Sequence, residues 1–598
     1  MPSFKNTVIT DKGRSLMAKI VAGTATPQFT KIRTSDYQYP EATNFESLTS
    51  MNNIKQEVDV ASVTKLNVST VNVSGAITNI GLASGYYVRN IGLYALDPIE
   101  GEILYSITPA IIADWMPPTG GSAISSIMVD LETTVSNSDN VSLTVNPNAT
   151  ATVKMINDIK TELADVKGFV GYTEDDIYGV EVDFVNRKFT RLAGAVNRTP
   201  GAGFDDVKAF GGRKRCNLTD GGKVIAYYGD AGYSETGALT QAITIGEGEA
   251  AITYPIGEKV QVMVEQPKFY YKVIPLKLEK VQDGKGFHMR KARYYVSDTK
   301  KDGFKLHPAF IHNGKEKNFI YLSAYEGSVF DVSAGQYILN DAQTTDFTAG
   351  SGDKMVSILG AKPASGLTQE LTRNGSRIIA QNRGKGWFQS YAATVAASQL
   401  LFLIEYASFN TQTAIGRGNV DKTDDGSTSM TEITGATTNL GNKSGSVTNV
   451  NGINIISYRG EENFWGNIWK WVDGLNIEAK GLNNLYVSDN GFADDIGTSP
   501  YKDAGIALAK ANGYVSAFAY NEEFDWLFFA SETAGDSALP VGDNFHQNNT
   551  YNGWFTAFLG GEWRYGSDAG GFCWFVNGTS SICDRYRGGR LVYVPNVA

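Results

Sequence analysis

The sequence predicts an α+β protein of several domains: a mostly-β N-terminal domain, a short coiled-coil neck and one large C-terminal domain. Three observations support this prediction. The chain has 598 residues, whereas a single hydrophobic core stops growing at about 250–300 residues. Of the nine tryptophans, only Trp115 precedes residue 387, so the front and the rear of the chain differ in composition. The apolar spacing also changes along the chain, from alternation to heptads and then to short strands among glycines.

Residues 1–150 combine one short helix with strands. Thr10 is a good helix N-cap, and an apolar run with helical spacing follows it through Leu16, Met17, Ile20 and Val21. Further on, apolar residues alternate with Ser, Thr and Asn in three runs: Val68, Val71 and Val73; Ile127, Val129 and Leu131; Val141, Leu143 and Val145. Alternation is typical of half-buried antiparallel strands. We therefore expect a sandwich-like β domain here.

Residues 151–168 carry a heptad pattern. Ile156, Ile159, Leu163 and Val166 are spaced 3, 4 and 3 residues apart, as along the seam of a coiled coil, and Gly168 is expected to end the helix. Two heptads cannot hold a helix in water without a partner for the apolar stripe. The pattern favours a self-associating neck. The alternative is an amphipathic helix that packs on its own domain.

The remaining chain divides into a β-rich shoulder, residues 169–270, and a larger domain, residues 271–598. A hairpin is expected from Ile177, with a turn at Asn186-Arg187-Lys188. Ser390–Tyr406 is almost wholly apolar and predicts a buried helix. The sequence leaves open whether the shoulder is a separate domain or part of the larger one.

Composition excludes several classes of function. The formal net charge is −10, which disfavours nucleic acid and anionic lipid as partners. Four histidines and three cysteines make a His/Cys metal cluster improbable, so we expect no metal and no cofactor. We find neither the ~20 apolar residues of a membrane helix nor a signal peptide. Cytoplasmic synthesis, no membrane insertion, and reduced, buried thiols at Cys216, Cys573 and Cys583 are therefore expected. The alternative is a disulfide between Cys573 and Cys583, which are close in sequence.

Two segments of the N-terminal region resemble a known family. Phe4–Gly13 (FKNTVITDKG) and Tyr87–Ala95 (YVRNIGLYA) are similar to the N-terminal domain of tail-collar fibre proteins from phages with P2-like contractile tails. The resemblance implies that residues 1–150 attach the chain to proteins of the tail baseplate. It also implies that the chain is a homotrimer located on the virion tail, made in the host cytoplasm and released by lysis.

Four segments of the rear region resemble the C-type-lectin-like fold in its sulfatase-modifying-factor branch. They are Gly303–Ile311 (GFKLHPAFI), Ile320–Ser328 (IYLSAYEGS), Tyr458–Gly474 (YRGEENFWGNIWKWVDG) and Gly560–Val594. Alternation along the third segment places Trp465, Trp469 and Trp471 in the core. The branch includes copper oxidases with closely spaced cysteines, but Cys573 and Cys583 are ten residues apart, which disfavours an enzyme of that kind.

The calcium motif of animal lectins is also missing from the sequence. Asp421, Asp424 and Asp425 could bind an ion, but we interpret them as a solvated acidic loop.

The candidate binding segment is Asn544–Arg587, in which aromatic and short polar residues are interleaved with glycine, as in antibody paratopes. In retroelement-diversified relatives, the corresponding stretch holds the exposed variable residues. The resemblance implies eight receptor-binding candidates: Trp563, Tyr565, Phe572, Trp574, Asn577, Asp584, Tyr586 and Arg587. About half of them are expected in the core. Tyr565, Asn577, Asp584 and Tyr586, with polar tips, are the surface candidates.

Three functions follow from these features. The first is a non-catalytic tail fibre, of a phage or a phage-tail-like particle, that binds a glycan or protein receptor on a bacterial surface. The second is a surface-polysaccharide depolymerase, which needs two carboxylates about 5–10 Å apart. Its candidates are Glu461, Glu462 and Asp473, then Glu522, Glu523 and Asp525. The third is a purely structural tail component.

Overall fold

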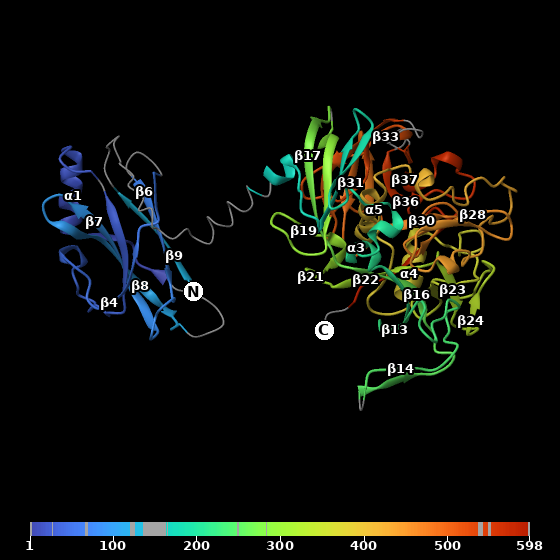
Figure 1. The fold of residues 1–598 in the computed structure, drawn as a ribbon, viewed down its shortest axis with the longest axis horizontal. Coiled ribbons are helices and arrows are strands. Elements are labelled where there is room, and N and C mark those ends of the chain that lie inside the picture. The colour runs from blue at the N-terminus through green and yellow to red at the C-terminus, as the bar shows by residue number, and fades with distance from the viewer. Residues whose placement is uncertain are drawn as a thin grey trace. The chain divides into compact units, whose positions relative to one another are not determined.

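The computed structural model describes residues 3–26, 28–65, 70–119, 126–134, 163, 166–247, 250–282, 284–535, 542–547 and 552–595. The chain divides into two compact units, Met1–Glu162 and Leu163–Ala598, and both are built mainly from strands (Figure 1). The balance therefore lies further toward β than an α+β protein implies. Among the described residues, no helix is both long and apolar enough to cross a membrane.

Unit 1 contains two sheets and one helix around a common core. The first sheet has the order β1-β8-β7-β3-β4, with β2 on β8, and the second has the order β5-β6-β9. The strands are β1 (Ser3–Phe4), β2 (Val8–Ile9), β3 (Phe29–Ser35), β4 (Ile54–Asp59), β5 (Ser62–Lys65), β6 (Thr70–Thr78), β7 (Tyr86–Asp97), β8 (Gly101–Met116) and β9 (Ser126–Thr134). Val71 of β6 and Val129 of β9 share one core with Val88 of β7, which confirms the sandwich-like arrangement.

The helix of unit 1 forms as the sequence predicts. Helix α1 (Asp11–Val21) begins after Thr10, whose side-chain oxygen accepts a hydrogen bond from the Gly13 amide at 3.0 Å. Leu16 and Ile20 are buried in the core of the unit. Of the other predicted apolar positions, Val68 and residues 141–145 lie outside the described residues.

The division between the two units falls within the expected neck, after Glu162, and helical residues 166–170 continue past Gly168. The prediction that Gly168 ends the helix is therefore wrong. A Cβ at Gly168 would lie 2.6 Å from Ile274 Cδ1, so the glycine serves a close approach to the neighbouring strand. Arg293 Nη1 donates to the carbonyl oxygens of Gly168 and Phe169 at 3.0 and 2.5 Å. Leu163 and Val166 are 54% and 57% exposed, whereas Ile156 and Ile159 lie outside the described residues.

A 14-stranded sheet dominates unit 2, with the main order β11-β10-β18-β33-β35-β37-β36-β30-β31-β32. Its strands are β10 (Ile177–Asp183), β11 (Lys188–Ala193), β17 (Tyr270–Lys280), β18 (Phe287–Ser297), β19 (Lys305–Leu306), β30 (Trp469–Lys480), β31 (Leu482–Val487), β32 (Lys502–Ala507), β33 (Gly513–Tyr520), β34 (Ala530–Gly535), β35 (Asn544–His546), β36 (Gly553–Gly560), β37 (Gly570–Gly578) and β38 (Arg587–Gly588). The hairpin expected from Ile177 is β10–β11, with Asp183 opposite Lys188.

A six-stranded sheet joins distant parts of the chain in the order β13-β12-β16-β22-β39-β26. Its strands are β12 (Lys214–Leu218), β13 (Val224–Tyr227), β16 (Gln261–Pro267), β22 (Phe319–Ser323), β26 (Trp387–Gln389) and β39 (Leu591–Tyr593). The expected boundary at residue 270 is therefore not a division between compact units. Residues 169–270 contribute strands to both large sheets and residues to the same core.

Smaller sheets and short helices complete unit 2. The strands are β14 (Ile243–Ile245) with β15 (Ile252–Tyr254), β20 (Ile311–His312) with β21 (Lys315–Glu316), β23 (Ser328–Asp331) with β24 (Gln336–Ile338) and β25 (Lys354–Val356), and β27 (Gly445–Thr448) with β28 (Asn454–Tyr458) and β29 (Glu461–Glu462). The helices are α3 (Lys208–Gly211), α4 (Arg373–Gln381), α5 (Ala392–Tyr406) and α6 (Thr411–Ala414). The β14–β15 hairpin projects from the unit (Figure 1).

Helix α5 is the buried helix that the sequence predicts, and every residue from Ala392 to Glu405 is buried. Its last turn includes the buried carboxylate of Glu405. Arg459 satisfies this carboxylate through two hydrogen bonds of 2.7 and 2.8 Å. Arg191 donates to the Ile404 and Glu405 carbonyl oxygens at 2.9 and 2.5 Å. These bonds satisfy the C-terminal carbonyl groups of a helix enclosed by protein.

Candidate functional site

Burial divides the eight candidate residues into two groups of four. Trp563, Phe572, Trp574 and Arg587 are at most 5% exposed. Tyr565, Asn577, Asp584 and Tyr586 are half-buried. This division follows the expected separation of core residues from residues with polar tips.

The buried aromatic residues belong to the core of the 14-stranded sheet. Phe572 packs edge-on against Phe409, with ring centroids 4.8 Å apart, and Trp574 stacks on Phe529 at 4.5 Å. Cys573, between them on β37, belongs to a separate cluster with Trp469 and Trp471. The strand therefore points alternate side chains to opposite faces. In this conformation Phe572 and Trp574 present almost no surface to a ligand.

The three tryptophans of the Tyr458–Gly474 segment also lie in the core, as predicted. Trp465, Trp469 and Trp471 are all buried. Trp465 Nε1 donates to the Gly416 carbonyl oxygen and Trp471 Nε1 to that of Leu371, each at 3.2 Å.

In the candidate segment, Tyr586 lies among arginine side chains that are paired with aspartates. We call Asp424, Asp425, Arg564, Arg585 and Tyr586 the Arg–Tyr surface. Arg564 Nη1 bonds Asp424 Oδ2 at 2.6 Å, and Arg585 Nη1 bonds Asp425 Oδ1 at 2.8 Å. Arg585 also bonds Asp424. The Arg564 guanidinium lies 4.5 Å from the centroid of the Tyr586 ring, which is cation–π geometry.

The carboxylates of the acidic loop are paired with arginine side chains. Asp421 is paired with Arg417 at 2.8 Å, and Asp424 and Asp425 are paired with arginines of the candidate segment. Hydrogen bonds from Thr428 are the main reason that the pKa of Asp425 is lowered, and Arg585 contributes. Asp421 and Asp425 are exposed and Asp424 is half-buried, as expected of a solvated acidic loop, but each carboxylate is also paired with a guanidinium.

Arg587 and Tyr565 are neighbours of the Arg–Tyr surface in the chain and pack against core aromatic residues. The buried Arg587 guanidinium lies 4.9 Å from the Tyr586 ring centroid and 4.8 Å from that of Phe558. It forms an ion pair with Asp584, and burial lowers its pKa to about 10. Tyr565 packs edge-on against Trp469 at 4.8 Å, and burial raises the pKa of its hydroxyl. These contacts hold both tyrosine rings in place.

Arg564 and Arg585 are functional candidates that the sequence reasoning missed. Both lie next to selected positions in the chain, Arg564 between Trp563 and Tyr565 and Arg585 between Asp584 and Tyr586. Arginine, tyrosine and tryptophan are the residues that contribute most often to binding hot spots. That adjacency was the available signal.

The first three carboxylates considered for a depolymerase are enclosed by protein. Glu461 bonds Arg213 and accepts a 2.7 Å hydrogen bond from Ser398. Glu462 accepts hydrogen bonds from the Gly435 and Thr437 amides, each at 2.7 Å. Asp473 is held by Arg377 at 2.6 and 2.9 Å.

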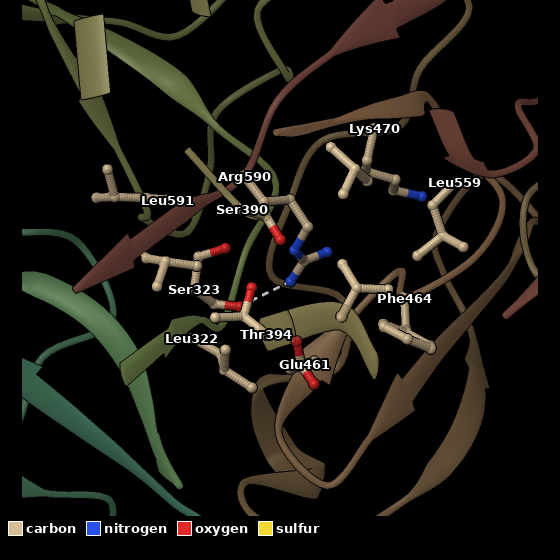
Figure 2. A pocket seen from close by; sticks show the side chains of 13 residues that line it. Leu322, Ser323, Ser390, Thr394, Glu461, Phe464, Lys470, Leu559, Arg590 and Leu591 are labelled. Atoms are coloured by element: carbon tan, nitrogen blue, oxygen red, sulfur yellow. Dashed lines mark hydrogen bonds between the residues drawn. The ribbon is translucent and has the colours of Figure 1, made fainter. Parts of the chain in front are cut away.

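The cavity beside Glu461 is too small for a substrate. Figure 2 shows it between Glu461, Lys470 and Arg590, with hydroxyl groups of Ser323, Ser390 and Thr394 nearby. Its volume is about 20 Å³, which is room for one water molecule. Arg590 donates to the Ser323 carbonyl oxygen at 2.7 Å. Burial lowers the pKa of Lys470 to about 8, against the opposing effect of Glu326.

The second group of carboxylates does not form a pair across a cleft either. Asp525 is buried and bonds the Tyr271 hydroxyl at 2.6 Å and Lys305 at 3.1 Å. Glu522 and Glu523 are exposed, and Glu523 pairs with Lys502 at 3.0 Å. None of the six nominated carboxylates is therefore placed as an acid and a base facing a bound polysaccharide.

All three cysteines are free thiols, and Cys216 and Cys573 are buried as expected. Burial raises the pKa of the Cys573 thiol well above its ordinary value, which suppresses the reactive thiolate. Cys583 is exposed, in contrast to the expectation that all the thiols are buried. It precedes Asp584 in a loop after β37.

No protein-family model matches the chain, and no curated protein matches it. Among solved structures, it is similar to the Major Tropism Determinant U1 variant, with 14% sequence identity and a TM-score of 0.24 over 72% of this chain and 96% of that chain. The I1 variant gives 13% identity and a TM-score of 0.24, over 69% and 93% of the two chains. The M1 variant gives 12% identity and a TM-score of 0.23, over 72% and 97%. Scores this low establish no common function, so the proposal below rests on this chain's own residues.

Proposed function

We propose that the protein is a non-catalytic receptor-binding fibre of a contractile-tailed phage or a phage-tail-like particle. In this proposal unit 2 is C-type-lectin-like and binds a bacterial surface molecule, while residues 1–150 attach the fibre to the baseplate. The observation that carries the binding role is the Arg–Tyr surface. Its central tyrosine is partly exposed, and Arg564 and Arg587 lie against the ring.

The chemistry of this surface suits recognition rather than catalysis. Tyr586 offers an apolar ring and a hydroxyl at low conformational cost. Arg564 and Arg585 are already paired with Asp424 and Asp425, so their donors are oriented before a ligand arrives. Pre-organisation of this kind reduces the entropy lost on binding. An aromatic contact contributes about 0.5–1.5 kcal/mol, so a single copy of unit 2 is expected to bind its receptor weakly.

Self-association through the neck would raise the avidity of the fibre, which compensates for weak binding by a single copy of unit 2. Leu163 and Val166 are both more than half exposed and continue the heptad spacing of Ile156 and Ile159. A homotrimer that buries these side chains presents three binding surfaces together. Linked sites of this kind raise avidity by about 10²–10⁴ without any new contact.

Cell-binding measurements with single variants test the proposal. Tyr586→Ala and Tyr565→Ala are compared with Tyr254→Ala, which removes a half-buried tyrosine from the separate β14–β15 hairpin. We expect each of the first two to weaken retention on susceptible cells about tenfold, since one aromatic hot spot contributes on the order of 1–2 kcal/mol. Tyr254→Ala should bind as the wild type does. Unchanged binding by both surface variants contradicts the proposal, and equal, negligible retention of the wild type on susceptible and resistant cells favours a structural role.

A further inference from the structure

A polar pocket opens beside the loop that follows β24, away from the buried cavity of Figure 2. Its volume is about 380 Å³, within the range of about 300–1,000 Å³ typical of ligand pockets. The polar side chains that line it belong to two segments of the chain: Gln343, Thr344, Thr345, Asp346, Thr348, Gln369 and Glu370. None of the described lining residues is a lysine, arginine or histidine.

The pocket is held in shape by hydrogen bonds between these two segments. The Gln369 side chain is buried; its Nε2 donates to the Ala342 carbonyl oxygen at 3.1 Å and its Oε1 accepts from the Thr344 amide at 3.3 Å. Asp341 accepts from the Ser365 amide and hydroxyl at 2.8 and 2.5 Å. The walls are therefore fixed before any ligand binds, which lowers the cost of binding.

The lining chemistry selects ligands with hydroxyl groups and without negative charge. Asp346 lines the pocket with a half-buried side chain, and among the described residues its Oδ1 atom has no hydrogen-bond partner, a state that costs free energy until a donor arrives. Its carboxylate lies within 4.8 Å of those of Asp331 and Asp353, so the local potential is negative and repels anions. Hydroxyl donors to a carboxylate form short, strong hydrogen bonds. The amides and threonine hydroxyls supply further donors and acceptors.

One backbone hydrogen bond links the chain just before the second pocket segment to the candidate binding segment. The Gly366 amide donates to the Asp584 carbonyl oxygen at 2.8 Å, and Gly366 precedes the lining residue Gln369 by three positions. A ligand that spans a few sugar units can therefore contact the pocket together with the loop of Asp584. From these observations we propose that the pocket binds a neutral sugar unit, and, resting on the proposed function, that this unit belongs to the bacterial receptor.

Saturation-transfer NMR with the full chain tests the inference. The probes are the methyl glycosides of glucose, galactose and mannose, with glucuronic acid as the anionic control, all in EDTA so that no cation bridges the three carboxylates. We expect transfer to at least one neutral glycoside and none to glucuronic acid. The double variant Gln343→Ala/Thr345→Ala should weaken this binding about tenfold. Both side chains are exposed, so the fold is retained.

Matched variants make the result specific. Gln241→Ala/Thr244→Ala changes the same two residue types at exposed positions on and before β14, and it should bind the glycoside as the wild type does. Asp346→Asn should also weaken binding, because it removes the charged acceptor. Absence of transfer to every neutral glycoside, transfer to glucuronic acid alone, or equal binding by the Gln343/Thr345 variant overturns the inference. If Tyr586→Ala loses cell binding while no glycoside binds, the pocket inference fails and the receptor-binding proposal stands.

Discussion

The two units of the chain place their arginines differently. In unit 1 the described arginines, Arg14, Arg33 and Arg89, are all at least partly exposed, and Arg33 pairs with Glu57 and Glu102 on the sheet surface. In unit 2 the described arginines include a fully enclosed group: Arg213, Arg215, Arg373 and Arg459. Unit 1 relies on a core of aliphatic and aromatic side chains between two sheets. Unit 2 uses buried guanidinium groups to fix long irregular loops, since each group donates to several acceptors at once.

This difference matters for a binding unit that is rich in loops. Arg373 joins the start of α4 to the Leu475 carbonyl oxygen, the Asn476 side chain and Asp494, at 2.6, 2.6 and 2.7 Å. Arg215 likewise bonds Tyr325 and Thr437, each at 3.1 Å. Loop residues Tyr325, Thr437 and Asp494 and the start of α4 are thereby held to strands β12 and β30. The candidate binding loops begin from this fixed framework.

The largest expected effect concerns the neck, which is the part of the chain expected to self-associate. Ile159→Asp with Leu163→Asp places charge in the apolar seam, so we expect the mass in solution to fall from trimer to monomer. Apparent affinity for cells should fall about 10²–10⁴-fold with it. Light scattering measures the mass, and Thr244→Asp with Thr253→Asp on the exposed hairpin is a control. An unchanged mass contradicts the neck.

The next largest effect concerns the buried charges of unit 2. Arg459→Ala leaves the Glu405 carboxylate enclosed without its ionic partner, and we expect a loss of about 3–5 kcal/mol in the free energy of unfolding of unit 2. Arg33→Ala removes the partly exposed pairs of unit 1 and should cost about 0–1 kcal/mol. Denaturant titration followed by tryptophan fluorescence for unit 2 and circular dichroism for unit 1 measures both. Equal losses would remove the distinction between the units.

A smaller, pH-dependent effect is expected at Asp543 in unit 2. Burial raises the pKa of Asp543 to about 7, against hydrogen bonds from Phe572 and Thr411. The unfolded group titrates near its ordinary pKa of 3.8, so between these values the native state binds more protons. Its contribution to stability is present below about pH 4 and is lost as the pH rises through about 7. The unfolding free energy of Asp543→Asn, relative to wild type, should therefore rise from pH 4.5 to pH 7.5. A pH-independent difference would contradict this assignment.

Local patterns predicted the elements whose causes lie within a few residues. The cap at Thr10, the buried helix expected over Ser390–Tyr406 and the hairpin after Ile177 each depend on neighbouring residues, and each forms, the helix over Ala392–Tyr406. The tryptophans of the Tyr458–Gly474 segment were also placed correctly in the core.

Long-range pairing could not be predicted in this way. Strands β10 and β16 of the expected shoulder pair with β18 and β22 of the remaining chain, and these pairings place the shoulder in the same sheets as the remainder of the unit. Arg564 and Arg585 meet Asp424 from 140 and 161 residues away. The spacing of neighbouring residues cannot show such a contact. For that reason the sequence predicted Tyr586 as a binding residue but missed Arg564 and Arg585.

Removal of residues 1–150 tests most directly whether the two units have separate roles. The truncated chain retains the neck and all of the Arg–Tyr surface, so the account predicts that it binds susceptible cells as the full chain does. It also predicts that tails assembled in its presence lack it. The measurement is retention on cells together with detection of the chain in purified particles. Particles that still carry the truncated chain, or a chain that no longer binds cells, would contradict the account.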